Sequence, residues 1–418
     1  IFHQIARYQK YYFELTDSSG NMMYYTANGL QQVIPKSGFF EYLYVNGTDV
    51  ITFPEWAKGV IYYQIFPERF CNGNRGNDPE GCKPWGTLPD REHHMGGDLQ
   101  GIIQKIPYLK ELGIECIYLN PIFEADFNHK YATTDYFKID SQFGTEETFR
   151  ELVDTCHSYG IRIVLDGVFN HTGEHFKPFQ DVLEKRWDSP YKDWFHIDFN
   201  GNSNYNDGLW YEGWEGNYDL VKLNLRNEEV IRHIFESIRL WVEEFDIDGL
   251  RLDVAYCLDH DFVRRLRSFC DSLKPDFFLV GEMLHGDYNQ LMNDQMLHSV
   301  TNYECYKGLY SSFNSMNLFE INHSLLRQFG PENWTLYKGK HLLCFVDNHD
   351  VSRVASILEN PAHLPLIYAL MFGMPGIPCI YYGSEWGAEG NKQQGDDALR
   401  PSFDAPEWNA LTDTIAAM

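Results

Sequence analysis

The stretch Asp-Gly-Leu-Arg-Leu-Asp-Val-Ala at residues 248–255 places charged side chains inside what otherwise reads as a buried β-strand. Because alternate side chains of a strand share a face, Arg251 and Asp253 point one way and the apolar residues beside them point the other. Burying an arginine and an aspartate is costly unless they are paired or take part in chemistry. Taken alone, this stretch fits a structural ion pair as well as it fits a reactive site.

Seven further short stretches and the helices between them predict the fold. Most are continuous apolar runs, as expected for strands buried on both faces of a parallel sheet. The clearest amphipathic helix spans 228–245 after the N-cap Asn227, and Thr145 and Gly160 bracket another at 146–159. This α/β pattern predicts a (β/α)8 TIM barrel, with a doubly wound sheet as the alternative. The predicted strands are 60–66, 115–120, 162–168, 249–255, 277–283, 299–304, 341–347 and 377–382.

Two segments fall outside the repeat of strands and helices. Residues 1–53 alternate apolar and polar side chains between turn signals, which predicts a partial N-terminal β-domain. Residues 172–224 are rich in aromatics and glycine and too long for an ordinary loop, which predicts an inserted subdomain (subdomain B) after strand three. The catalytic barrel is therefore expected over residues 54–171 and 225–418.

The composition restricts the class of partner and the compartment. A formal net charge of −26 argues against nucleic acids and anionic membranes, because both bind clustered Lys and Arg. The apolar runs are far shorter than the ~20 residues of a membrane-spanning helix. Nine cysteines without a CxxC pair are typical of reduced thiols, so a cytoplasmic location is favoured. The chain begins at Ile1 without a methionine, so its native N-terminus is expected to be missing.

Polar side chains gather at the ends of four predicted strands, where barrel enzymes carry their active sites. A single acid at a strand end is usually a helix cap or a salt-bridge partner. Four strands that deliver carboxylates, histidines and an arginine to one rim favour catalysis instead. The residues are Asp166 and His171 after strand three, Arg251 and Asp253 on strand four, Glu282 after strand five, and His349 and Asp350 after strand seven.

Paired carboxylates suit glycoside hydrolysis, in which one carboxylate attacks and one acid protonates the leaving oxygen. The sequence has no glycine-rich phosphate loop, HExxH motif or nucleophile-elbow serine. Asp253 lies beside Arg251 and is expected to stay ionised, which suits a nucleophile. Glu282 follows an apolar run whose desolvation is expected to raise its pKa, which suits a general acid. Asp350 is expected to hold sugar hydroxyls.

Four motifs, at 166–171, 249–255, 281–282 and 346–350, resemble in sequence and order the four signature regions of the α-amylase family. The resemblance covers about residues 54–418. It implies a retaining mechanism on α-glucosidic bonds, with Asp253 as nucleophile, Glu282 as acid/base and Asp350 as transition-state stabiliser. It also implies sugar-binding roles for His171, Arg251, His349 and Tyr131, although Tyr131 is also consistent with ordinary core packing.

Shorter motifs at 63–70, 96–101 and 128–131 resemble the neopullulanase, cyclomaltodextrinase and maltogenic amylase group. This implies cleavage of α-1,4-glucosidic bonds in cyclodextrins, pullulan, starch fragments or maltooligosaccharides, and a possible homodimer of the full-length protein. The alternatives are a glucanotransferase or isomerase on the same scaffold, and a non-catalytic glucan-binding relative, against which the retained carboxylates argue. Met283 and Leu284 replace the valine and tryptophan usual in the group, so the acceptor side is expected to differ.

The stretch Asn-Gly-Asn-Arg-Gly-Asn-Asp at residues 72–78 is rich in the hard oxygen ligands that calcium prefers. Such runs also form plain turns. The resemblance favours calcium, because related enzymes bind it with this loop and the Gly-Gly-Asp segment at 96–98. It implies a structural calcium ion with the candidate ligands Asn72, Asn74, Asn77, Asp78, Gly96 and Asp98.

Overall fold

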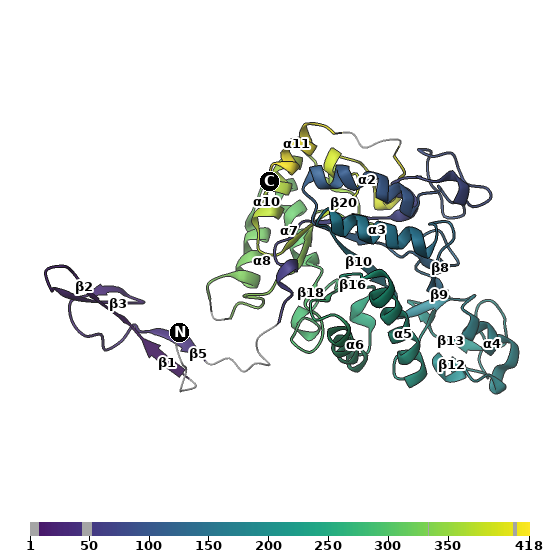
Figure 1. Cartoon of the computed structure of the whole chain (residues 1–418), viewed down its shortest axis with the longest axis horizontal. Coiled ribbons are helices and arrows are strands. Elements are labelled where there is room, and N and C mark those ends of the chain that lie inside the picture. Colours follow the sequence, from purple (N-terminus) through teal and green to yellow (C-terminus); the bar gives the residue numbers. More distant parts are fainter. Residues whose placement is uncertain (1–7, 44–51, 333, 404–407) are drawn as a thin grey trace. The chain divides into compact units, whose positions relative to one another are not determined.

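The computed structural model describes residues 8–43, 52–332, 334–403 and 408–418. The chain divides into two compact units, Ile1–Ile51 and Thr52–Met418. In the smaller unit, short antiparallel strands form a two-stranded and a three-stranded sheet (purple in Figure 1). Residues 1–7 and 44–51 of the predicted N-terminal domain lie outside the described residues. The strands of this unit are β1 (Tyr8–Tyr11), β2 (Phe13–Thr16), β3 (Met22–Thr26), β4 (Gly29–Gln31) and β5 (Phe40–Leu43).

All eight predicted barrel strands are present in the larger unit, where they form one parallel sheet in the order β18-β17-β16-β10-β7-β6-β20-β19. A parallel bridge between Thr301, just after β18, and Leu343 of β19 closes the ring. The predicted (β/α)8 barrel is confirmed, because a doubly wound sheet would leave its two edges apart. The strands are β6 (Tyr62–Ile65), β7 (Cys116–Leu119), β10 (Arg162–Gly167), β16 (Gly249–Leu252), β17 (Phe278–Gly281), β18 (Ser299–Val300), β19 (Leu343–Phe345) and β20 (Ile377–Tyr381).

Helices lie around the outside of the sheet (Figure 1). The two helices whose bounds the sequence predicts begin where expected. The longest follows Asn227, whose side chain accepts hydrogen bonds from the backbone N–H groups of Glu229 and Val230. Another follows Thr145, which forms a capping box with Thr148. The main helices are α2 (Leu99–Leu112), α3 (Glu146–Ser158), α5 (Glu228–Phe245), α6 (His260–Leu273), α7 (Tyr303–Asn314), α8 (Phe319–Phe329), α10 (Leu364–Gly373) and α11 (Ala410–Ala416).

Two features of the barrel depart from a regular alternation. Between β17 and β18 the only helical element is a 3₁₀ turn, Tyr288–Gln290, and Leu291 and Met292, which follow it, are buried. After β7 the chain forms an antiparallel hairpin, β8 (Phe123–Ala125) and β9 (Thr133–Ile139), before it enters α3. The hairpin carries Tyr131 in its connecting loop.

The segment predicted as an inserted subdomain, 172–224, forms small antiparallel sheets and one helix beside α5 (Figure 1). The first sheet begins one residue earlier, at His171, so a predicted sugar-binding residue belongs to a strand of this segment. The elements are β11 (His171–Gly173), α4 (Lys177–Lys185), β12 (Ile197–Asp198), β13 (Trp210–Tyr211), β14 (Gly213–Trp214) and β15 (Asn217–Lys222).

The register of the barrel brings the polar strand ends together. Asp166 of β10 pairs with Arg251 of β16, and Arg251 pairs in turn with Val280 of β17. The residues that follow Val280 therefore reach the same rim as Asp166 and Arg251. All nine cysteines are free thiols. No helix in the described ranges combines the length and the apolar character needed to span a bilayer.

A buried charge network fixes the opposite end of β16. The carboxylate of Asp248 accepts hydrogen bonds from His157 (Nε2, 2.7 Å), Arg162 (Nη1, 2.8 Å), Lys274 (Nζ, 3.1 Å) and the backbone N–H of Ile163 (3.0 Å). Burial alone would raise the pKa of Asp248. The hydrogen bonds and the charge of Lys274 outweigh burial and lower this pKa to about 2.

We expect Asp248→Ala to lower the free energy of unfolding at pH 7 by about 3 kcal/mol, because it leaves buried donors without their acceptor. The folded-state pKa lies below that of an unfolded aspartate, so the contribution is present above pH ~4 and is lost as the pH falls towards 2. Chemical denaturation at several pH values measures it. Glu243→Ala, which removes the exposed partner of Arg239, is the control and should have little effect. A cost for Asp248→Ala that did not shrink in acid would contradict this account.

Candidate active site

The guanidinium of Arg251 lies at the centre of a cluster of carboxylates inside the barrel rim. Its Nη1 donates to both oxygens of Asp166 (2.9 and 3.0 Å) and to Oδ1 of Asp253 (3.0 Å). Its Nη2 lies 3.0 Å from Oε2 of Glu282. All four side chains are buried, with Arg251 only 4% exposed. One cation thus joins acids from three neighbouring strands.

The backbone after β16 is bent so that it serves this cluster. The strand ends at Leu252, and Val254 adopts a left-handed conformation (φ 38°, ψ 47°) that β-branched residues rarely take. In this conformation the N–H of Val254 donates to Oε2 of Glu282 (2.9 Å). Such strain persists only where the surrounding structure enforces it, and it is common at active sites.

The protonation of Asp253 differs from the sequence prediction. Burial is the largest influence and raises the pKa of Asp253 well above its usual value, Arg251 lowers it, and the neighbouring carboxylates Glu282, Asp166 and Asp350 raise it again. Arg251 favours the ionised form of Asp253, as expected from the sequence, but burial and the neighbouring acids oppose it, because one guanidinium serves three acids. Burial also raises the pKa of Glu282, as predicted. We infer that the cluster around Arg251 retains at least one proton at neutral pH.

Asp350 contacts a different cation, Arg400, and its pKa is lowered, whereas those of Asp253 and Glu282 are raised. Its Oδ1 accepts a hydrogen bond from Nη2 of Arg400 (3.0 Å), and Nε2 of His349 lies 3.1 Å from its Oδ2. Burial would raise the pKa of Asp350, but His349, Arg400 and Arg251 lower it. Burial lowers the pKa of His349 to about 3, so this imidazole is neutral at neutral pH. Arg400 and Arg251 are therefore the main cations that keep Asp350 ionised.

The predicted sugar-binding residues surround the same carboxylates. The hydroxyl of Tyr131 donates to Oδ2 of Asp166 (2.8 Å), and its ring stacks on His349 with centroids 5.6 Å apart and planes 8° from parallel. Nε2 of His171 lies 4.0 Å from Oδ2 of Asp253 and has no hydrogen-bond partner. Burial lowers the pKa of His171 to about 4, so it too is a neutral hydrogen-bonding group.

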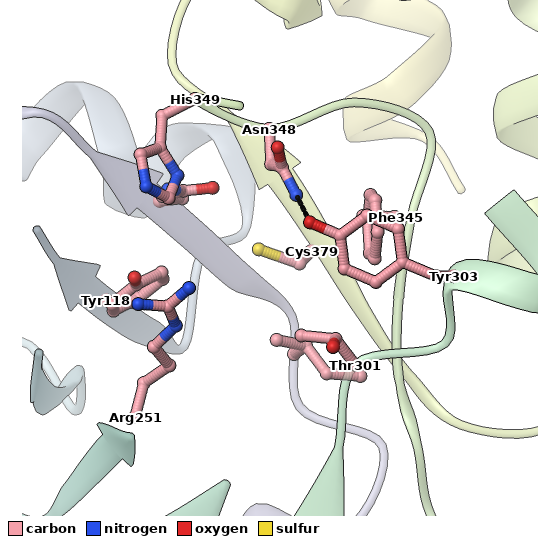
Figure 2. Close-up of a pocket in the computed structure, with 10 residues that line it drawn as sticks. Tyr118, Arg251, Thr301, Tyr303, Phe345, Asn348, His349 and Cys379 are labelled. Atoms are coloured by element: carbon pink, nitrogen blue, oxygen red, sulfur yellow. Dashed lines mark hydrogen bonds between the residues drawn. The ribbon is translucent and has the colours of Figure 1, made fainter. Parts of the chain in front are cut away.

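A small cavity of about 20 Å³ adjoins Arg251 on the inner face of the barrel, large enough for roughly one water molecule. Figure 2 shows Arg251 next to Tyr118 on one side of it and the hydrogen bond from Asn348 to the hydroxyl of Tyr303 (3.0 Å) on the other. Tyr118 also donates to Oδ2 of Asp166 (2.8 Å). Polar groups therefore line the floor beneath the carboxylate cluster.

The arrangement combines the chemical groups that displacement at an acetal carbon requires. It contains an acid whose pKa is raised, a second carboxylate on the same guanidinium, and a third carboxylate that stays ionised. A sequence profile of the alpha-amylase catalytic domain matches residues 64–410. The chain belongs to the alpha-amylase family.

Similar proteins lie within one part of this alpha-amylase family. A maltogenic alpha-amylase of Bacillus acidopullulyticus is 42% identical over 373 residues, which cover 86% of this chain and 61% of that protein. A cyclomaltodextrinase of Thermoanaerobacter pseudethanolicus is 39% identical over 395 residues, covering 91% and 67%. The chain therefore spans about three fifths to two thirds of the length of the curated relatives it matches.

A solved structure of a related glycoside hydrolase is also similar to this chain. The cyclic α-maltosyl-(1→6)-maltose hydrolase of Arthrobacter globiformis has a TM-score of 0.78 and 34% sequence identity, covering 88% of this chain and 83% of that one. The resemblance to the cyclomaltodextrinase and maltogenic amylase group is confirmed.

The predicted calcium ligands cluster where β6 leads into α2. Nδ2 of Asn72 donates to Oδ1 of Asp78 (2.7 Å), and a Cβ added to Gly96 would lie 2.5 Å from that same oxygen. The side-chain oxygens of Asn72 and Asn77 are buried without hydrogen-bond partners. Unpartnered amide oxygens beside a carboxylate fit a hard cation such as calcium.

Two other candidates in this loop already have partners. The side chain of Asp98 caps α2, accepting hydrogen bonds from the backbone N–H groups of Gly73, Asn74 and Gly101. The side-chain oxygen of Asn74 accepts one from the backbone of Gly76. Among the described residues, no three His, Cys, Asp or Glu side chains are placed to share a metal ion. The loop therefore offers mainly neutral oxygens.

Sequence reasoning missed several residues that contact the predicted site. Asp166 was visible as the acid that ends strand three, but no role was assigned to it. Gln64, whose Nε2 lies 2.7 Å from Nδ1 of His349, stands within β6 and carried no charge to mark it. Arg400 lies in the irregular chain after β20, where no strand or helix pattern predicts its position.

We expect Asp253→Asn to raise the free energy of unfolding at pH 7 by about 1–2 kcal/mol, because it removes a buried acid whose charge burial and neighbouring carboxylates oppose. A raised pKa means that the folded state holds a proton the unfolded chain releases above pH ~4, so stability is lost as the pH rises. The gain should therefore shrink near pH 4. Denaturation curves at both pH values measure it.

Asp350→Asn provides the matched comparison, because the pKa of Asp350 is lowered and its charge is paired with Arg400. This variant should lose stability at neutral pH and lose less in acid. Destabilisation of both variants at pH 7 would show that Arg251 governs Asp253 after all.

Proposed function

We propose that this chain is a retaining glycoside hydrolase that cleaves α-1,4-glucosidic bonds in cyclodextrins, pullulan, starch fragments or maltooligosaccharides. The observation that carries the proposal is the contact of one buried guanidinium, that of Arg251, with both Asp253 and Glu282. A shared guanidinium holds two carboxyl groups close together. Retaining enzymes need such a pair, with a typical separation of ~5–5.5 Å.

Glu282 acts first as the acid. Arg251 and the N–H of Val254 both bind its Oε2, so in the described site Oε1 is the oxygen that can carry a proton. That proton passes to the glycosidic oxygen as the C–O bond to the leaving sugar breaks. Burial favours the protonated form needed for this step.

Asp253 acts as the nucleophile. In the reactive form of the site, the proton that the cluster retains lies on Glu282, and Asp253 is ionised. As Glu282 gives up that proton, the carboxylate of Asp253 attacks the anomeric carbon and forms a glycosyl ester. Glu282, now ionised, removes a proton from water, the water oxygen attacks the anomeric carbon, and the ester bond to Asp253 breaks. Two inversions restore the α configuration, and Glu282 ends protonated as it began.

The remaining residues stabilise charge and hold the sugar. Asp350 stays ionised and faces the positive charge that develops on the sugar ring, as an electrostatic stabiliser. His171 and His349 are neutral and can exchange hydrogen bonds with sugar hydroxyls. Tyr131 provides an aromatic face at the same place.

Two rival functions use the same scaffold. A glucanotransferase or an isomerase would pass the glycosyl ester to a sugar hydroxyl instead of to water. Met283 and Leu284 depart from the residues usual in the group on the acceptor side, and a changed acceptor side is compatible with transfer to a sugar. A non-catalytic glucan-binding relative would retain sugar contacts without turnover, and the complete set of acids argues against it.

We expect β-cyclodextrin to be opened to linear maltooligosaccharides, pullulan to yield panose, and maltotriose to be hydrolysed. Glu282→Gln should lower kcat at least about 100-fold, because the amide cannot donate the proton. Chromatography of the products, together with NMR of the first anomer released, measures cleavage and retention.

Glu304→Gln is the control, because Glu304 pairs with Arg327 on the outer helices and should leave kcat unchanged. The proposal would be overturned if none of the three substrates were turned over, or if Glu282→Gln kept full activity. Products longer than the substrate or of equal mass would favour the transferase or the isomerase.

We also propose a structural calcium ion in the loop at 72–78. The unpartnered oxygens of Asn72 and Asn77 and the carboxylate of Asp78 support this proposal. The ion would supply positive charge that holds the loop against the start of α2. The proposed homodimer of the full-length protein and the cytoplasmic location stay predictions.

We expect calcium added to chelator-treated protein to raise the midpoint of thermal unfolding by about 5 °C, because an ion that binds only the folded state stabilises it. Asp78→Ala should abolish this shift, and Asp154→Ala, a change at an exposed position on α3, should preserve it. An equal shift in Asp78→Ala, or none in the unmodified chain, would count against the site.

A further inference from the structure

Asp350 depends on a residue outside the barrel strands for its position. Arg251 contacts Asp253 and Glu282, whereas the carboxylate of Asp350 contacts Arg400 through Oδ1 and the neutral His349 through Oδ2. Arg400 also donates from Nε to the carbonyl oxygen of His349 (3.0 Å), so its side chain holds both the backbone and the carboxylate of the strand-seven end. The place of Asp350 therefore follows the place of Arg400.

The segment that carries Arg400 has little regular structure of its own. Between β20 and α11 the described chain forms only short 3₁₀ turns, the last being Asp396–Leu399. A segment of this kind is held by its contacts rather than by a hydrogen-bond ladder. Contacts made by its backbone near Arg400 are therefore the ones that matter.

Arg353 makes one of those contacts from a completely buried position. Its Nε donates to the carbonyl oxygen of Leu399 (3.1 Å), and its Nη1 donates to the carbonyl oxygen of Tyr382 (2.8 Å) and to Oγ of Ser384 (3.0 Å). The side chain is 0% exposed and lies over the ring of Tyr381, 4.3 Å from its centroid. One guanidinium thus joins the start and the end of the segment after β20.

Arg69 makes the neighbouring contact from another side. Its Nη1 donates to the carbonyl oxygen of Arg400 itself (3.1 Å), and its side chain is also almost fully buried. Two arginines therefore hold two consecutive carbonyl oxygens, those of Leu399 and Arg400. Burying two guanidinium groups is costly. Arginine offsets part of that cost because its rigid, planar group of N–H donors can form several hydrogen bonds at once.

We propose that Arg353, together with Arg69, is a positioning residue for Asp350, acting through the backbone of Leu399 and Arg400. The two buried arginines aim Arg400 at the carboxylate, and Arg400 keeps that carboxylate oriented towards the sugar. This inference rests on the proposed function and assigns a role to a side chain that touches no substrate.

The first experiment compares Arg353→Met and Arg353→Lys with the unmodified chain on β-cyclodextrin. Arg353→Met should lower kcat by about 10- to 100-fold with KM changed less than about twofold, because a displacement of ~1 Å at a reacting group costs that much. Arg353→Lys keeps the charge but not the fork, so it should recover part of the loss. Arg267→Met is the matched control, since Arg267 is also buried and donates to the carbonyl oxygen of Met296, far along the chain from Arg400.

The pKa of Asp350 separates positioning from general loss of stability. Loosening Arg400 should raise this pKa in Arg353→Met, as measured by NMR titration of the carboxyl group, whereas a smaller folded fraction would leave it in place. Arg267→Met should lower stability without raising this pKa. The charged or titratable groups facing Asp350 are His349, Arg400, Lys392, Arg251, Asp253 and Glu282, and the Arg353 variants retain all six.

A double-mutant cycle tests the route of the effect. If Arg353 acts through Arg400, then Arg353→Met should change kcat by less than about twofold when Arg400→Met is already present. Losses that multiply would overturn the proposal, and so would a shift of the pKa of Asp350 in Arg267→Met equal to that in Arg353→Met.

Crystal structures supply a readout that does not need turnover. The contact between Nη2 of Arg400 and Oδ1 of Asp350, 3.0 Å here, should lengthen or disappear in Arg353→Met, or in Arg353→Lys if the first variant does not fold. An unchanged contact would refute the inference. If the unmodified chain cleaves none of the glucans, the proposed function fails while this geometry still decides the role of Arg353.

Discussion

The structure depends on one buried cation that three acids share. The guanidinium of Arg251 binds Asp166, Asp253 and Glu282, which come from three adjacent strands. Removing such a group from water costs several kcal/mol, and only good geometry with its partners offsets that cost. The parallel register supplies the geometry, because it sets Asp166 directly beside Arg251 and brings the end of β17 level with both. Closing the ring through Thr301 and Leu343 makes that register hard to change.

Much of this could be predicted because the decisive residues lie at strand ends. Each barrel strand is a short apolar run, so its end is visible in the sequence, and the carboxyl ends of parallel strands meet at one rim. Asn227 and Thr145 cap their helices as expected, since capping is a local property. Because the strand ends are visible in the sequence, the acids and histidines of the site could also be named from the chain alone.

Other features could not be predicted because they depend on the number and direction of neighbours in space. Arg251 is two residues from Asp253, and that nearness suggested a simple pair. The pKa of Asp253 is raised by burial, and further because Glu282 and Asp166, distant in sequence, share the same guanidinium. Arg400 was missed because irregular chain gives no periodic signal. The 3₁₀ turn in place of a helix after β17 was missed because apolar residues such as Leu291 and Met292 cover a sheet equally well in either form.

The two cations of the site divide its acids into two kinds. Around Arg251 there are more carboxylates than positive charges, and burial raises the pKa values of Asp253 and Glu282, so at least one proton is retained. Arg400 lies 3.0 Å from Asp350 and 3.7 Å from the more exposed Asp396, and the pKa of Asp350 falls instead. Acid catalysis needs a group that keeps a proton until the bond breaks, and stabilisation of a developing positive charge needs one that stays ionised. Chemically similar side chains at one rim meet these opposite needs only because their cations are distributed unequally. The second cation lies on irregular chain, so it must be held by something other than a strand, and two buried arginines that bind consecutive carbonyl oxygens are suited to hold it.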